Sequence, residues 1–309
     1  MIVLAGIPSE SPLSMVRKEL ESMNSEFILF NQREFEHISL DFCIENKEVS
    51  GTLEIRATKY ELAQIKGMYV RLMDDNFLPE IENEPPDSEK RLRSKILHES
   101  LYLFCEIAPC KVINRMSAMG SNSSKPFQAQ IIRKHGFSIP ETLITNNSKD
   151  VIEFKNRFDK VIYKSISGVR SIVKVLDDED MQRLKFISMC PVQFQEYVDG
   201  LNVRVHVIGD KVFATSIETD FTDYRYAAKF GSDAKLKPFT LDDDTTQKCI
   251  KLSKTLGLDF AGIDLKITTD NRVFCFEVNP SPAFPYYQSN TDQPIARSVA
   301  EYLTSTDRT

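Results

Sequence analysis

Several signatures of soft-metal chemistry are absent from this sequence of 309 residues. Its six cysteines are scattered without a Cys-x-x-Cys pair, and its four histidines form no His-Glu-x-x-His motif. Zinc sites typically use such clusters, so hydrolysis at a soft metal has little support. Scattered cysteines are typical of free thiols in a reducing compartment, and we therefore expect a cytoplasmic protein.

The sequence also lacks long apolar runs and a basic character. No segment approaches the roughly 20 apolar residues of a membrane-spanning helix, and the N-terminus has no basic start of the secretory kind. The net charge of −6 does not indicate the overall basic surface that is typical of proteins that bind nucleic acid. A single glycine, Gly6, follows the first apolar run, so a dinucleotide fingerprint is missing there. We expect no membrane and no nucleic-acid partner.

Apolar and turn patterns divide the chain into three expected domains. Residues 1–111 open with a strand, a helix and a returning strand, which is typical of an α/β domain. Residues 112–199 combine a well-marked helix with strand-rich segments. Residues 200–309 contain two strand pairs joined by short turns, and helices between them. The predicted fold class is therefore α/β, with α+β character in the C-terminal two-thirds.

The segment FCFEVNPSP alternates residue types like the last strand of a core sheet. A period of two places Phe274, Phe276 and Val278 on one face, which we expect to be buried in the core. It places Glu277 and Asn279 on the other face. An ionised glutamate on such an apolar strand is costly unless a group pairs with it. The pattern therefore predicts a partner for Glu277.

A strand pair with its tip at Asp270-Asn271 supplies one partner, because both residue types tolerate a positive φ. Antiparallel pairing about this tip sets Asp264 directly opposite Glu277, on the same face, and Gly262 opposite Asn279. Two carboxylates that face each other across strands repel, and the repulsion grows as water is excluded.

Two interpretations of this carboxylate pair remain open from the strand pair alone. An oxygen-only set of aspartate, glutamate and asparagine suits Mg²⁺ or Mn²⁺ and leaves coordination positions for phosphate and water. Alternatively, Asp264 and Glu277 form a structural network with Lys266, Lys174 or an arginine.

Two lysines favour the metal interpretation. Lys164 ends the apolar run VIYK before a loop that contains serine, glycine and arginine, and such a loop can offer backbone N–H groups to phosphate. Lys125 lies at the start of a helix capped by Ser124, where the helix dipole does not favour a cation. Together with an Asp/Glu/Asn metal set, these lysines describe an ATP site.

The order of Lys125, Lys164, QEYV, VRVHV, GIDL and FEVNPSP resembles the ATP-grasp superfamily. The resemblance is closest to RimK-type and glutathione-synthetase-type ligases, with the graspetide synthetases as a neighbouring group. It covers about residues 112 to 305. It implies an N-terminal pre-ATP-grasp α/β domain followed by the two α+β subdomains of an ATP-grasp fold, the second of which carries the metal site.

The resemblance also assigns expected roles to single residues. Residues that contact the nucleotide are Lys125, Lys164, Arg225 and the hinge Gln195, Glu196, Tyr197 and Val198. Residues that act on the transferring phosphoryl group or the acyl phosphate are Arg225, Lys164 and Arg204. The magnesium ligands are Asp264, Glu277 and Asn279. The chain departs from the RimK-type pattern at Asn202, where an aspartate is usual, and at Tyr226 and Ala227, where serine and asparagine are usual.

The implied activity is an ATP- and Mg²⁺-dependent carboxylate–amine ligase that works through an acyl phosphate. Its expected substrates are a peptide, protein or small-molecule carboxylate and an amine, and relatives of this type commonly form homo-oligomers. A peptide macrocyclase that makes side-chain ester or amide crosslinks is the alternative, and a non-catalytic ATP-binding module is a third interpretation. His206 is either a general base or a hydrogen-bonded structural histidine.

Overall fold

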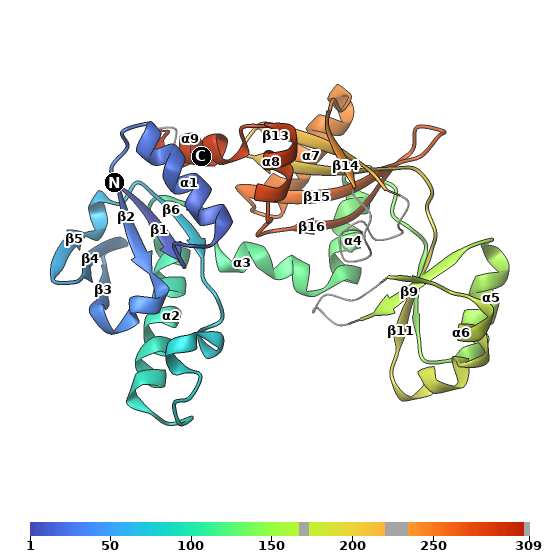
Figure 1. Ribbon diagram of the computed structural model, residues 1–309, viewed down its shortest axis with the longest axis horizontal. Coiled ribbons are helices and arrows are strands. Elements are labelled where there is room, and N and C mark those ends of the chain that lie inside the picture. The colour runs from blue at the N-terminus through green and yellow to red at the C-terminus, as the bar shows by residue number, and fades with distance from the viewer. Residues whose placement is uncertain (167–172, 220–233, 306–309) are drawn as a thin grey trace.

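The computed structural model describes residues 1–166, 173–219 and 234–305 (Figure 1). The chain begins with a parallel sheet of strand order β2-β1-β6-β7. Its elements are β1 (Ile2–Gly6), α1 (Ser11–Ser22), β2 (Phe27–Asn31), β6 (Gly67–Arg71), α2 (Glu89–Ile107) and β7 (Lys111–Ile113). Every residue of β1 is buried, which agrees with the short continuous apolar run expected of a central parallel strand.

A separate antiparallel sheet is inserted between β2 and β6. It consists of β3 (Ile38–Glu45), β4 (Glu48–Ile55) and β5 (Thr58–Glu61). Helix α2 packs against β3, and Phe104 of this helix contacts Phe42 of the strand with ring centroids 5.9 Å apart. The insertion therefore shares its core with the parallel sheet.

The middle of the chain forms a four-stranded antiparallel sheet of order β10-β9-β11-β8. Its elements are β8 (Thr142–Thr145), α5 (Ser148–Arg157), β9 (Val161–Ser165), β10 (Lys174–Val175), α6 (Asp178–Gln182) and β11 (Val192–Glu196). Two helices, α3 (Met116–Met119) and α4 (Lys125–Lys134), run between this sheet and the N-terminal one (Figure 1).

The C-terminal part is a five-stranded antiparallel sheet of order β14-β13-β12-β15-β16. Its elements are β12 (Leu201–Ile208), β13 (Lys211–Glu218), β14 (Lys235–Phe239), α7 (Asp243–Thr255), β15 (Phe260–Ile267), β16 (Val273–Asn279), α8 (Pro285–Thr291) and α9 (Ile295–Thr304). Helix α9 returns to pack on α1, so that Leu13 and Val16 share a core with Val299 and Leu303 (Figure 1).

Short 3₁₀ helices complete the described secondary structure at Gln32–His37, Leu62–Gln64, Asp75–Phe77, Pro79–Ile81, Gly120–Ser123 and Leu184–Met189. The described helices include none that is long and apolar enough to cross a membrane. A parallel α/β sheet followed by two antiparallel α+β sheets confirms the predicted fold class. The boundaries at residues 111 and 199 stay a prediction.

Candidate functional site

A cleft of about 800 Å³ lies among α4, the strands of the central sheet and β16. Polar residues on its lining include Lys125, Lys164, Gln195 and Glu196, which were all expected to contact a nucleotide. They come from α4, β9 and β11, so separate elements bring them to one cavity. A pocket of this volume accommodates a ligand the size of a nucleotide.

The predicted register of the β15–β16 hairpin is confirmed from Gly262 to Asp264 and is wrong by one residue nearer the tip. Asp264 is the partner of Glu277, and Gly262 is the partner of Asn279. Asn271 adopts a φ of 61°, as expected for the tip. A β-bulge follows, however, because the next pair on the tip side joins Leu265 to Cys275 and leaves one residue of β16 unpaired.

The bulge changes which residues share a face, so the expected grouping of the two phenylalanines with Val278 is wrong, although Phe274 is buried as expected. Phe274 and Phe276 line the cleft, whereas Cys275 and Val278 pack in the core of the C-terminal sheet. An extra residue in one strand reverses the alternation beyond it. Glu277 therefore lies on the same side as the aromatic wall of the cleft.

Both predicted metal-binding carboxylates contact a cationic side chain. Lys125 Nζ lies 2.8 Å from Glu277 Oε2, and Arg204 Nη1 lies 2.8 Å from Asp264 Oδ1. These contacts offset the repulsion between two facing carboxylates. They are also ion pairs of the kind that the structural interpretation predicted, with Lys125 and an arginine as the partners.

The two other lysines considered for such a network have different partners. Lys174 contacts Asp177 and Asp180, at 3.2 and 3.0 Å. Lys266 is buried and donates to the carbonyl oxygen of Val198 at 3.0 Å. Burial lowers the pKa of the Lys266 ammonium. The expectation that either lysine pairs with Asp264 or Glu277 is wrong.

Arg204 is a buried cation held on several sides. Its residue is 5% exposed, and its guanidinium lies over the ring of Tyr287 at 5.7 Å from the ring centroid. A Cβ atom at Gly262 would lie 2.0 Å from Nη2 of Arg204 and 2.7 Å from Cβ of Pro282. A glycine opposite Asn279 therefore makes the room that the guanidinium occupies.

The expected hinge runs from the end of β11 into the following turn. Gln195 donates through Nε2 to Thr142 Oγ1 at 2.9 Å, and its buried Oε1 has no hydrogen-bond partner among the described residues. Glu196 Oε1 accepts a hydrogen bond from the Glu141 amide. Tyr197 lies beneath the Lys160 ammonium, 3.7 Å from the ring centroid. An unsatisfied amide oxygen is a group that a donor on a purine base could satisfy.

The loop after β16 contacts the N-terminal sheet, which the sequence did not reveal. Asn279 Oδ1 accepts a hydrogen bond from the Ser281 amide at 2.9 Å. Arg71 donates through Nη1 to Ser281 Oγ at 2.7 Å and forms a bidentate pair with Glu10. Arg71 ends β6, and its position at the carboxyl end of a parallel strand is the sequence signal that could have indicated a role in the site.

His206 fits neither of its two expected roles. Its side chain is completely buried, and neither ring nitrogen has a hydrogen-bond partner among the described residues. Burial lowers the pKa of the imidazole well below its usual value, and the nearby Arg204 guanidinium lowers it further. The ring packs edge-on against Tyr287, with centroids 4.9 Å apart. A neutral imidazole enclosed in this way has no access to a substrate proton.

One predicted residue, Arg225, lies outside the residues that the structure describes. In the described ranges no three His, Cys, Asp or Glu side chains form a metal-binding group. The predicted set contains two carboxylates and one amide, a composition that fits Mg²⁺ with phosphate or water in its other positions. Asp264, Glu277 and Asn279 stay the predicted ligands.

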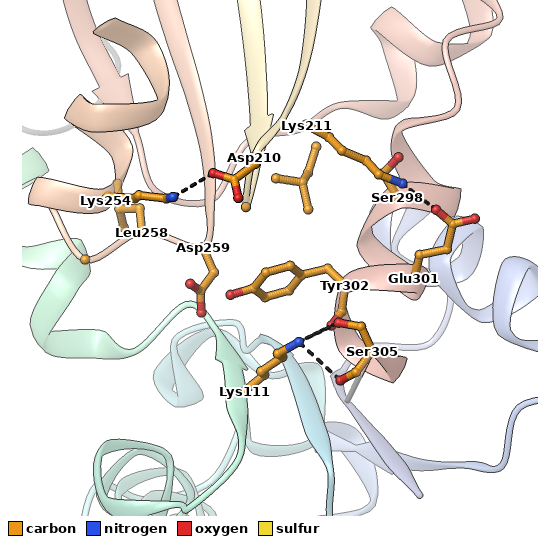
Figure 2. A pocket seen from close by; sticks show the side chains of 13 residues that line it. Lys111, Asp210, Lys211, Lys254, Leu258, Asp259, Ser298, Glu301, Tyr302 and Ser305 are labelled. Atoms are coloured by element: carbon orange, nitrogen blue, oxygen red, sulfur yellow. Dashed lines mark hydrogen bonds and ion pairs between the residues drawn. The ribbon is translucent and has the colours of Figure 1, made fainter. Parts of the chain in front are cut away.

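A second cavity, of about 620 Å³, lies away from this cleft (Figure 2). It is bounded by β7, the β12–β13 turn, the end of α7 and α9. Four of its charged residues form two ion pairs, Lys211 with Glu301 and Lys254 with Asp210, both at 2.6 Å. None of the predicted site residues lines it.

Comparisons with known proteins identify the family of this chain. The RimK-like ATP-grasp domain family matches residues 122–303, more than half of the chain. A "Probable alpha-L-glutamate ligase" of Haemophilus influenzae is 26% identical over 63% of this chain and 71% of its own. The human "Beta-citrylglutamate synthase B" is also 26% identical, over 63% of this chain and 53% of its own.

Solved structures extend the similarity to the whole chain. A Chryseobacterium gregarium RiPP-associated ATP-grasp ligase, in complex with ADP and a leader and core peptide, aligns with a TM-score of 0.83 at 22% identity, over 98% of this chain and 96% of its own. The ATP-grasp ligase PsnB, complexed with minimal precursor, Mg and ADP, aligns with a TM-score of 0.77 at 26% identity over the same shares. The chain belongs to the RimK-like ATP-grasp family and is an ATP-dependent ligase of that family.

Proposed function

We propose that this protein is a Mg²⁺-dependent carboxylate–amine ligase that acts on a peptide, protein or amino-acid-like substrate. The observation that carries the proposal is the position of Asp264 opposite Glu277, beside a cleft lined by Lys125 and Lys164. Facing carboxylates next to two ammonium groups suit a magnesium–triphosphate ligand better than a purely structural network.

The proposed chemistry proceeds in two displacements. A substrate carboxylate oxygen attacks the γ-phosphorus of ATP, and ADP leaves. An amine then attacks the carbonyl carbon of the acyl phosphate, inorganic phosphate leaves with the C–O bonding pair, and the amine loses a proton to solvent. The work of the protein is therefore positioning and charge neutralisation.

The predicted site residues divide this work. Lys125 and Lys164 hold the phosphates, and Gln195 to Val198 hold the adenine edge. Arg204 and Arg225 stabilise charge on the transferring group. Asp264, Glu277 and Asn279 would hold Mg²⁺, or Mn²⁺ in its place, and the ion would offset the negative charge of the phosphates. On binding, Lys125 and Arg204 exchange their present carboxylate partners for phosphate and substrate oxygens.

A second function, macrocyclisation of a precursor peptide, is favoured by one specific observation. PsnB was solved with a minimal precursor, and it aligns with 98% of this chain at a TM-score of 0.77 and 26% identity. In this variant of the chemistry, a side-chain hydroxyl or amine of the same peptide attacks the acyl phosphate, and the ring closes as phosphate leaves.

Mass spectrometry of candidate peptides incubated with ATP and Mg²⁺ separates the two functions. Ligation adds the mass of an amine component less one water, whereas macrocyclisation removes water and adds nothing. ADP release should accompany either product. A panel of amino acids and peptides that yields neither a product nor ADP would contradict both functions.

The Glu277→Ala variant tests the metal assignment. We expect its rate of ADP release to fall at least about tenfold, because one of two carboxylate ligands is lost. The matched control is Glu153→Ala, at an exposed glutamate of α5, which should release ADP at the wild-type rate. A Glu277→Ala protein with wild-type turnover would remove the metal site from the proposal.

A further inference from the structure

Gln128 binds the backbone of the strand that carries two predicted metal ligands. It lies in α4 and is 1% exposed. Its Nε2 donates to the carbonyl oxygen of Val278 at 2.9 Å, and its Oε1 accepts from the Val278 amide at 2.8 Å. The side-chain amide thus makes both hydrogen bonds that a neighbouring strand would make to this residue.

Val278 is the residue between Glu277 and Asn279, and it lies on the open edge of the sheet. β16 is an edge strand, so its outer backbone groups need partners from elsewhere. Ser138 supplies them near the start of the strand, where it bonds to Val273 and Cys275 at 3.0 and 2.9 Å. Gln128 supplies them on the far side of the bulge. The edge is therefore held on both sides of Phe276 and Glu277.

The same helix also carries a predicted nucleotide ligand. Lys125 lies three residues before Gln128, and its ammonium contacts Glu277 at 2.8 Å. One turn of α4 therefore bonds to β16 at two successive residues, once through an ion pair and once through an amide clamp. The two hydrogen bonds between Gln128 and the Val278 backbone do not involve the Lys125 ammonium. A change in the partner of Lys125 therefore breaks neither of them.

We propose that Gln128 is a positioning residue for the metal site: its clamp on Val278 fixes the direction of the Glu277 and Asn279 side chains and their distance from Lys125. The inference rests on the proposed function, because it assumes that these two side chains bind the metal. Glutamine suits the position because its planar amide offers one donor and one acceptor together. Glutamate at neutral pH offers acceptors only, and methionine offers no comparable donor.

Binding of Mn²⁺ to the protein with ATP, measured by electron paramagnetic resonance, tests the proposal. We expect Gln128→Met and Gln128→Glu to bind Mn²⁺ about 10- to 100-fold more weakly, the usual effect of removing the support of a metal ligand. The Glu variant is informative because its added negative charge would by itself strengthen cation binding. Affinity for ATP without metal, measured by calorimetry, should stay at the wild-type value.

Two controls separate positioning from simple destabilisation. Ser253→Ala removes another buried hydrogen bond, from Ser253 Oγ to the Leu258 carbonyl at 2.7 Å, in α7 and away from the cleft. It should lower Tm and leave Mn²⁺ binding unchanged. In a Glu277→Gln background, the further loss caused by Gln128→Glu should be much smaller than in the wild type, because one supported ligand is already missing.

Different outcomes overturn different parts of the argument. A wild-type protein that binds no Mn²⁺ in the presence of ATP would contradict the proposed function itself. A wild type that binds Mn²⁺, with a Gln128→Glu variant that binds it equally well, would overturn the positioning role alone. The same conclusion would follow if Ser253→Ala weakened Mn²⁺ binding as strongly as the Gln128 variants.

Discussion

At the scale of single residues, the carboxylates of the candidate site form ion pairs, and the geometry of one pair depends on a neighbouring glycine. Arg204 reaches Asp264 only because Gly262, on the adjoining strand, has no side chain. The guanidinium, the ring of Tyr287 and Pro282 surround this point. A methyl group there would clash with the guanidinium and with Cβ of Pro282, and the guanidinium moves more easily because it ends a flexible side chain.

Gly262→Ala should therefore impair activity without unfolding the protein. We expect ADP release to fall by about tenfold to a hundredfold, because a displacement of about 1 Å at a reacting group has effects of this size. The control is Gly120→Ala, since a Cβ atom at Gly120 has no atom within 4 Å. Equal rates of ADP release in the two variants would show that the close approach of Arg204 to Gly262 does not affect the reaction.

At the scale of secondary-structure elements, one asparagine joins the segment after β7 to the C-terminal sheet. Asn114 Oδ1 accepts from the amides of Asp259 and Phe260, at 2.9 and 3.1 Å. Its Nδ2 donates to the carbonyl oxygens of Phe260 and Pro280, at 2.6 and 2.5 Å. Pro280 follows Asn279, so Asn114 also fixes the start of the loop after the predicted metal ligands.

Asn114→Leu should lower the free energy of unfolding by about 3 kcal/mol or more, because it leaves several buried backbone groups without partners. Urea denaturation measures this loss. Asn290→Ala is the control: this exposed side chain makes one hydrogen bond, to the Tyr286 carbonyl, and its loss should cost less than about 1 kcal/mol. Similar losses in the two variants would contradict the role of Asn114 as a junction.

At the scale of the whole molecule, the N-terminal and C-terminal parts meet around the cavity of Figure 2. Lys111 of β7 bonds to the carbonyl oxygens of Tyr302 and Ser305 at the end of α9, both at 3.2 Å. The Asp259 carboxyl group lies beside the hydroxyl end of Tyr302 (Figure 2). Burial raises the pKa of its carboxyl group above the usual 3.8, although the Tyr302 hydroxyl, Arg115 and Lys111 act in the other direction.

This shift predicts a pH dependence of stability. An aspartate with a raised pKa in the folded state stabilises the protein fully below pH 3.8 and loses that contribution as the pH rises through the folded value. Asp259→Asn has no carboxyl group to titrate, so its Tm should fall less than that of the wild type as the pH rises from about 4 to 7. Parallel Tm curves for the two proteins would contradict the prediction.

Local chemistry in the sequence was enough to predict the fold class, the order of the motifs and a β15–β16 hairpin with its tip near Asp270-Asn271. The predicted pairing of Asp264 with Glu277 also holds, because the bulge offsets a shift of one residue in the pairs nearer the tip. The face of Phe276 was beyond such reasoning, because a bulge leaves no fixed mark in the alternation that it interrupts.

The contacts between residues far apart in the chain could not be predicted from the sequence. Lys125 and Glu277 are separated by 152 residues, Gln128 and Val278 by 150, and Arg71 and Ser281 by 210. No periodicity of helix or strand links such positions, because each contact depends on how whole elements pack. The chemistry of the site could therefore be predicted from the sequence, whereas the side chains that support it were identified only in the folded chain.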